Sequence, residues 1–110
     1  MKKGSAYRKG DIIVVSFPFS DFSGEKRRPA LVVGCSEEHV IVLFITTKKT
    51  GGRWLVPIPA SSKTGLLAPS YVRCDKLLAV DVAITEGGIG AAEESLIHKV
   101  DAKLRRLLSL

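Results

Sequence analysis

The apolar positions of the first eighty residues fall in short runs separated by polar turns. These runs are rich in β-branched side chains, which favour an extended backbone. The pattern predicts five strands, over residues 11–17, 28–34, 39–47, 53–58 and 70–80. A further short strand is expected around Ile84 or Ile89. Pro57 cannot donate a ladder hydrogen bond, so the fourth strand is expected at an edge of the sheet.

The apolar pattern changes period near the C-terminus. Leu96, Val100 and Leu104 recur at helical spacing, with basic residues between them. Acidic residues in the first turn and basic residues near the end complement a helix dipole. We therefore predict a helix over residues 92–109. Several short strands followed by one amphipathic helix are typical of a small β-barrel packed by a C-terminal helix.

The length of the chain predicts one domain, and its charge favours a particular kind of partner. At 110 residues the chain is expected to form one domain, residues 1–110, that begins with a basic arm over residues 1–9. The formal net charge is +6. Residues 1–80 carry 13 Lys and Arg against 6 Asp and Glu, whereas residues 81–110 carry 4 against 5. A basic strand region favours an anionic partner such as nucleic acid, although a basic protein that is merely soluble has the same composition.

The remaining composition excludes several kinds of chemistry. Cys35 and Cys74 lack CxxC spacing, so two reduced, largely buried thiols are expected rather than a disulfide framework. His39 and His98 have no Cys, Asp or Glu at ligand spacing, which argues against a metal site. No cofactor motif, phosphate loop or serine elbow occurs. Without an apolar leader or an 18-residue apolar run, the chain is expected to be cytoplasmic and to have no membrane partner.

One stretch stands out as a candidate for chemistry. Pro29 biases Arg28 towards an extended backbone, which predicts that this arginine sits at the mouth of a strand. A guanidinium held there suits a phosphate, because its planar donors match two phosphate oxygens at once. The alternative is a strand-end arginine that is only solvated.

Other polar residues occur near the ends of the predicted strands. Thr46 and Thr47 end the third strand, where threonines are more often ordinary β-branched strand residues than functional ones. The loop 18–26 carries Ser20 and Ser23, together with Phe19 and Phe22, which are expected to pack it down. With the neighbouring basic side chains, these residues resemble an anion-binding surface made from two loops.

Four segments, in this order, resemble the MazF/PemK endoribonuclease toxins. They are Lys9–Val15, Gly24–Val33, Ile45–Thr47 and Ser70–Leu77, and the resemblance covers residues 8–108. It implies an SH3-like barrel that forms a homodimer. It also implies that the chain is the toxin component of a type II toxin–antitoxin system. Such a toxin would cleave single-stranded RNA at selected sequences without a metal, and a cognate antitoxin would inhibit it.

The resemblance assigns roles to individual residues. Arg28 matches the catalytic arginine of the family and Thr46 its catalytic threonine. The residues expected to bind RNA are Ser23, Lys26, Arg27, Thr47, Lys48, Lys49 and Arg53. Two segments depart from the family pattern: Lys48 and Lys49 after the threonine pair, and residues 74–76 on the fifth strand.

The assigned chemistry is consistent with the residue types. Arginine is a poor general base because it stays protonated, so Arg28 is expected to clamp the phosphate and stabilise developing charge. Neither histidine occupies a matching position, which predicts slow turnover. Two alternatives remain open from the residues alone: a non-catalytic toxin of this fold that acts on a topoisomerase, and an RNA-binding module without cleavage.

Overall fold

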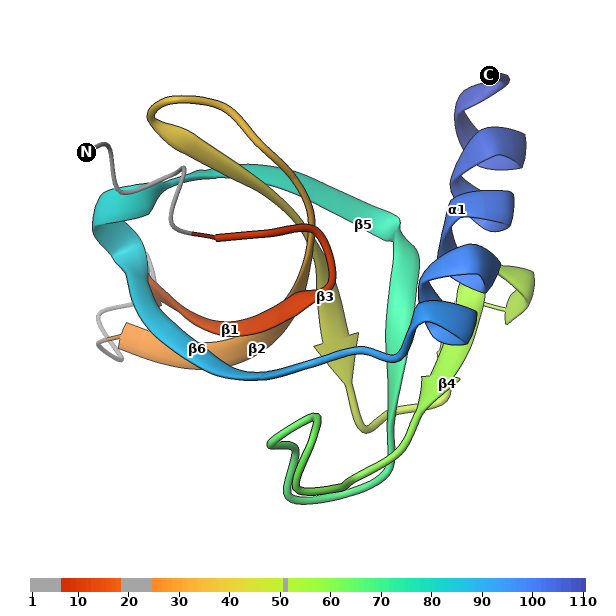
Figure 1. Cartoon of the computed structure of the whole chain (residues 1–110), viewed down its shortest axis with the longest axis horizontal. Coiled ribbons are helices and arrows are strands. Elements are labelled where there is room, and N and C mark those ends of the chain that lie inside the picture. Colours follow the sequence, from red (N-terminus) through yellow and green to blue (C-terminus); the bar gives the residue numbers. More distant parts are fainter. Residues whose placement is uncertain (1–6, 19–24, 51) are drawn as a thin grey trace.

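The computed structural model describes residues 7–18, 25–50 and 52–110. The described chain forms one antiparallel sheet and a C-terminal helix (Figure 1). The elements are β1 (Asp11–Pro18), β2 (Glu25–Cys35), β3 (His39–Thr46), η2 (Gly52–Trp54), β4 (Leu55–Ile58), β5 (Ser70–Asp81), η3 (Val82–Ile84), β6 (Thr85–Ala91) and α1 (Glu94–Leu108). This arrangement confirms the predicted small, mainly β, barrel-like fold with a C-terminal helix.

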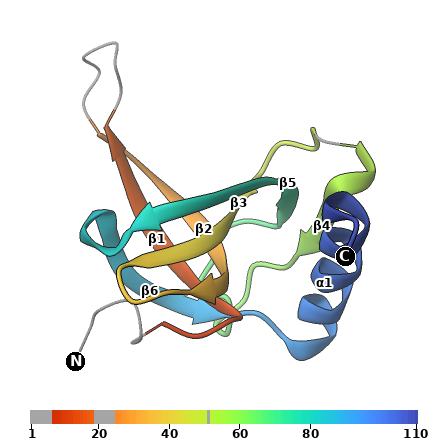
Figure 2. The ribbon, with the colours of Figure 1, turned by 90° about the horizontal axis from the view of Figure 1, so that it is seen from above.

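The sheet is strongly coiled but not closed by strand pairing. Its strand order is β4-β5-β3-β2-β1-β6, which leaves β4 and β6 as the two edges. Figure 2 shows how the ribbon curls, with α1 standing beside β4. The position of β4 confirms the edge expected from Pro57, whose missing N–H would break a ladder inside a sheet.

The loop after β4 closes the open side of this barrel. The backbone N–H of Ala91, at the end of β6, donates to the carbonyl of Lys63 at 2.8 Å. The Thr64 side chain is buried, and its hydroxyl donates to the carbonyl of Pro59 at 2.9 Å, which fixes the loop turn. A Cβ at Gly90 would clash with the carbonyl oxygens of Lys63 and Thr64, so glycine is required where loop and strand meet.

Two apolar clusters bury the two faces of the central strands. The helix-side cluster contains Ile12, Leu31, Leu43, Ile45, Val56, Ile58, Leu66, Val72, Cys74, Leu96 and Val100. The opposite cluster contains Ile13, Val15, Ala30, Val32, Val40, Val42 and Val80. Because β1, β2 and β3 are covered on both faces, their sequences read as continuous apolar runs rather than as strict alternation.

The structure corrects several boundaries. Arg28 does not lie at the beginning of a strand. The strand β2 begins three residues earlier, at Glu25, and its residues 25–28 are all paired with β1. Arg53 and Trp54 form part of η2 instead of a strand, and α1 is shorter at both ends than predicted. Cys35 is exposed, because it ends β2 where the chain turns away; Cys74 is buried as expected.

The expected basic arm falls almost entirely outside the described residues, which begin at Tyr7. Tyr7 is tied to the barrel, since its hydroxyl donates to Oγ1 of Thr85 at 2.9 Å. None of the helices in the described segments has the length and apolar character needed to cross a membrane.

Candidate functional site

Arg28 lies where β2 changes partners. It pairs with Val15 of β1. Because alternate strand residues share a face, Arg28 lies on the same face of β2 as Ala30 and Val32, which belong to the opposite cluster. The residue is half-buried. A partly buried arginine packs its aliphatic stem against apolar neighbours and keeps its charged head in water, where it can meet an anion.

The strands β2 and β3 separate at this point. Their ladder ends at the pair Ala30–Phe44, beyond which β2 continues with β1 alone and β3 with β5 alone. Figure 2 shows the β1–β2 ribbon leaving the rest of the sheet. Arg28 and Thr46 each lie two residues beyond the last pair, in the same direction. The structure therefore brings them to the same end and the same face of two neighbouring strands.

The hydroxyl of Thr46 has a defined orientation. Its Oγ1 accepts a hydrogen bond from the backbone N–H of Lys48 at 3.1 Å. A threonine hydroxyl has one proton and two lone pairs, so with one lone pair engaged it can still donate to an incoming oxygen. The turn after β3 thus prepares Thr46 to donate to an anion such as a phosphate oxygen.

Tyr71 is a candidate that sequence reasoning did not single out. It pairs directly with Thr46 across the β3–β5 ladder, and residues directly opposite one another share a face of the sheet. Its side chain is half-buried. A partly exposed aromatic ring beside a hydroxyl that can bind an anion suits the stacking of an unpaired base. The signal is the register between β3 and β5, which no local pattern in the sequence reveals.

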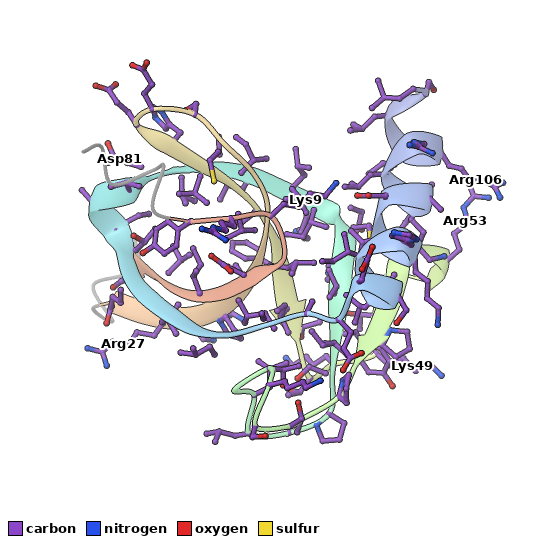
Figure 3. All side chains as sticks on the ribbon, in the orientation of Figure 1. Lys9, Arg27, Lys49, Arg53, Asp81 and Arg106 are labelled. Carbon is purple, nitrogen blue, oxygen red and sulfur yellow. The ribbon has the colours of Figure 1, made fainter. Side chains whose placement is uncertain are left out.

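The expected RNA-binding cations do not form a single patch on one chain. Arg27 pairs with Glu86 at 3.1 Å, and Arg53 lies over the ring of Trp54 at 4.9 Å. Figure 3 shows Arg27 on one side of the molecule and Lys49 and Arg53 on the other. Lys26 lies next to Arg27, and Thr47 and Lys48 follow the end of β3; all three are exposed. Ser23 lies outside the described residues, as do Ser20, Phe19 and Phe22.

The segment that departs from the family pattern contains an ordered ion pair. The guanidinium of Arg73 donates from Nε and Nη2 to the two carboxylate oxygens of Asp75, at 3.1 and 2.7 Å. These hydrogen bonds hold the pKa of Asp75 below its usual value. Cys74 points into the core between them, and burial raises its pKa to about 11. The alternating Arg73 and Asp75 could have indicated this pair, because alternate strand residues share a face.

No group of three or more His, Cys, Asp or Glu residues in the described segments is arranged to hold a metal ion. The candidate site instead presents a guanidinium, a hydroxyl and a phenol on one face of the sheet. All three suit contacts with an anion or a base, as a single-stranded nucleic acid would offer.

Comparison with known proteins gives a family match over nearly the whole chain. A family model described as "PemK-like, MazF-like toxin of type II toxin-antitoxin system" matches residues 8–108. This confirms the range over which the sequence resembles that family. None of the curated proteins compared matches the chain.

Solved structures share the fold at low sequence identity. The crystal structure of MazE-MazF (Form-III) from Deinococcus radiodurans has a TM-score of 0.78 and 22% identity, covering 94% of this chain and 97% of that chain. The Mycobacterium tuberculosis toxin MazF-mt6 has a TM-score of 0.73 and 25% identity, covering 91% and 97%. An endoribonuclease in complex with its cognate antitoxin, from a mycobacterial species, has a TM-score of 0.76 and 16% identity, covering 94% and 96%.

Proposed function

Because this chain belongs to the PemK-like, MazF-like toxins of type II toxin–antitoxin systems, we propose that it is an endoribonuclease that cleaves single-stranded RNA. The observation that carries the proposal is the placement of Arg28 and Thr46 at the same end and face of two strands that separate there. A related structure is described as an endoribonuclease in complex with its cognate antitoxin, which supports the same activity here.

The proposed reaction is an internal transfer that needs no bound metal. The 2′-OH gives its proton to a water molecule and attacks phosphorus, so that a new P–O2′ bond forms while the P–O5′ bond breaks and the 5′-oxygen takes a proton from water. Arg28 clamps the non-bridging oxygens and stabilises the charge that develops on them. The hydroxyl of Thr46 donates a hydrogen bond to one of these oxygens and so orients the phosphate. Tyr71 stacks against a base beside the scissile bond.

Charged side chains near this centre would hold the flanking RNA. Lys26 and Arg27 lie next to Arg28, and Thr47, Lys48 and Lys49 follow Thr46. Ser23 and Arg53 complete the proposed RNA-binding set. Since Arg27 and Arg53 lie on opposite sides of one chain, an RNA that contacts both must cross the molecule or span two copies.

We further propose that the chain acts as a homodimer and is inhibited by a cognate antitoxin. The related mycobacterial endoribonuclease is in complex with its cognate antitoxin, which supports the antitoxin partner. Light scattering of the purified chain gives its mass in solution. A mass of about 12 kDa, that of one chain, at micromolar concentration would argue against the dimer.

Mapping of RNA ends tests the proposed activity directly. Purified protein is incubated with several long single-stranded RNAs in EDTA, and the new 5′ ends are mapped. We expect cuts at a recurring short sequence, with rates at least about 100-fold lower for Arg28→Ala, because one charge-stabilising donor contributes on the order of 10²–10³ to such a step. Arg28→Lys keeps the charge but loses the fork, so partial activity is expected.

Arg105→Ala provides the matched control, because it removes an exposed arginine from α1, far along the chain from Arg28. Equal loss in this variant would indicate a general charge effect. Full activity of a folded Arg28→Ala protein would remove Arg28 from the mechanism. Intact RNA with the wild-type protein would favour a non-catalytic toxin acting on a topoisomerase, or an RNA-binding module without cleavage.

A further inference from the structure

The β3–β5 ladder is interrupted close to Tyr71. Its pairs jump from Val72 to Leu77 on β5, while β3 changes by only two residues. Residues 73–76 of β5 therefore outnumber Phe44, the single β3 residue between the same two pairs. Strand irregularities of this kind redirect side chains and are common beside functional sites. This one begins two residues after Tyr71, the candidate base-stacking residue.

Arg73, the first residue of this irregular segment, lies on the same face of the sheet as Thr46 and Tyr71. Thr46 and Tyr71 are directly opposite each other, so they share a face. Arg73 follows Tyr71 by two residues, and β4 pairs with β5 over residues 70–73 without a register shift. The alternation of the strand therefore gives Arg73 the face of Tyr71, at a separation of about 7 Å along the strand.

Asp75 fixes the orientation of the Arg73 guanidinium. Nε and Nη2 of Arg73 donate to the two carboxylate oxygens of Asp75 at 3.1 and 2.7 Å. A guanidinium has five N–H groups, and this pair uses one from each of these two nitrogens. The outer edge of the guanidinium, formed by Nη1 and the second N–H of Nη2, points away from Asp75. The Arg73 side chain is 22% exposed, so part of it is accessible to a ligand.

A guanine base fits this outer edge. Guanine offers two acceptors, O6 and N7, that match a guanidinium fork, and arginine to guanine is the commonest specific contact of this kind. Adenine carries an amino group in place of O6, which would oppose an arginine N–H with a second donor. Uracil and cytosine lack the N7 acceptor. In single-stranded RNA this edge of an unpaired base is open to a protein.

We propose that Arg73 recognises a guanine next to the nucleotide that stacks on Tyr71, and that Asp75 positions Arg73 for this contact. The inference rests on the proposed function and names one base of its RNA substrate. Arg73 contacts the base, whereas Asp75 acts only through Arg73. An ion pair that merely stabilised the fold would leave the base preference of the protein unchanged, so that preference distinguishes the two roles.

Cleavage rates on matched oligonucleotides test the proposal. Each guanine in the mapped cleavage sequence is replaced in turn by adenine. At one position we expect the wild type to prefer guanine at least about tenfold in kcat/KM, because a bidentate contact discriminates strongly between bases. Arg73→Met keeps the length of the side chain but removes its donors, and should bring this ratio to about one. Arg105→Met makes the same substitution on α1 and should leave the ratio unchanged.

Modified bases identify the atoms that are recognised. Inosine at the same position keeps O6 and N7 and should be cleaved like guanine. In contrast, 7-deazaguanine lacks N7 and should be cleaved at least about threefold more slowly. Asp75→Asn should lower the preference for guanine in the wild-type background and have no further effect in Arg73→Met. These measurements on the wild-type chain also test the contact if Arg73→Met folds poorly by circular dichroism.

The proposal is overturned by equal rates for guanine and adenine at every position, or by a folded Arg73→Met protein that keeps the preference. An equal loss in Arg105→Met, or a preference that inosine abolishes, would also overturn it. If the wild type cleaves none of the RNAs, the proposed function fails. Uracil-rich oligonucleotides with one guanine or one adenine are then compared by fluorescence anisotropy. A preference for guanine that Arg73→Met removes would support the recognition, whereas equal affinities would overturn it too.

Discussion

Asp75 illustrates how one ion pair links sequence to a pH-dependent property. Its pKa is lowered because Arg73 donates two hydrogen bonds to the carboxylate. The unfolded chain then binds this proton more readily than the folded one. The stabilisation is present above the usual pKa of 3.8 and is lost as the pH falls through the lower pKa of the folded state.

We therefore expect Asp75→Asn to lower the melting temperature at pH 7 by about 3 °C, as a partly exposed pair contributes at most about 1 kcal/mol. The difference from wild type should shrink on acidification below pH 3.8, as the pH falls through the lowered pKa of the folded state, as followed by circular dichroism. In an Arg73→Gln background the same substitution should have little further effect. A difference that persists unchanged at low pH would assign the effect to packing rather than to charge.

Single residues also mark where the sequence was and was not sufficient. Pro57 predicted an edge strand because its missing N–H has a direct geometric consequence. Arg28 was placed at a strand mouth, because its polar neighbours Lys26 and Arg27 resemble a loop when read alone. In the structure the backbones of Lys26 and Arg27 are paired with residues 17 and 16 of β1. The pairing of Tyr71 with Thr46 depends on register between distant strands, which local patterns do not encode.

At the level of elements, the contact between β6 and the loop after β4 holds the open barrel together. Gly90 lies against the carbonyl oxygens of Lys63 and Thr64, leaving no room for a side chain. We expect Gly90→Ala to destabilise the fold by about 2 kcal/mol or more, because two backbone segments must move apart, and to lower the melting temperature by about 10 °C.

Gly88 on the same strand provides the control. A Cβ there would lie 3.8 Å from the carbonyl oxygen of Ile12, an ordinary contact. Gly88→Ala should therefore change the melting temperature by less than about 4 °C. Equal destabilisation by the two variants would indicate that β6 is intolerant of side chains in general. The close contact of Gly90 with the carbonyl oxygens of Lys63 and Thr64 would then not be the cause of the destabilisation.

The elements themselves were largely predictable, whereas their closure was not. Six strands and the helix follow from runs of β-branched residues and from the change of period near Leu96. The turn over residues 61–64 read only as a polar loop. Its buried Thr64 became apparent only in three dimensions, because β6, some 25 residues further along the chain, packs against the backbone of Lys63 and Thr64.

At the scale of the whole molecule, the basic charge divides between two surfaces. One surface lies at the ends of β2 and β3, which are flanked by Lys26, Lys48 and Lys49. The other lies on α1, where Lys99, Lys103 and Arg106 line a cavity beside β4. The charge balance along the sequence assigned the basic surface to the strand region. It could not reveal the second one, because the five acidic residues between positions 81 and 110 offset the four basic ones in any count along the chain.

This division predicts how RNA binding responds to salt. Binding of a single-stranded RNA is measured with the Arg28→Ala protein, which is expected not to cleave, from about 50 to 200 mM salt. Removing one cation that binds a phosphate should reduce the slope of log K against log salt by about 0.7 for a single strand. If Lys48 and Lys49 hold the RNA beside Thr46, replacing both by Ala should reduce the slope by about 1.4.

The same measurement with Arg105→Ala should leave the slope unchanged, since that arginine lies on neither surface. If the slope falls equally in both variants, RNA binding depends only on the net charge of the chain. That result would contradict an RNA site at the strand ends around Arg28 and Thr46.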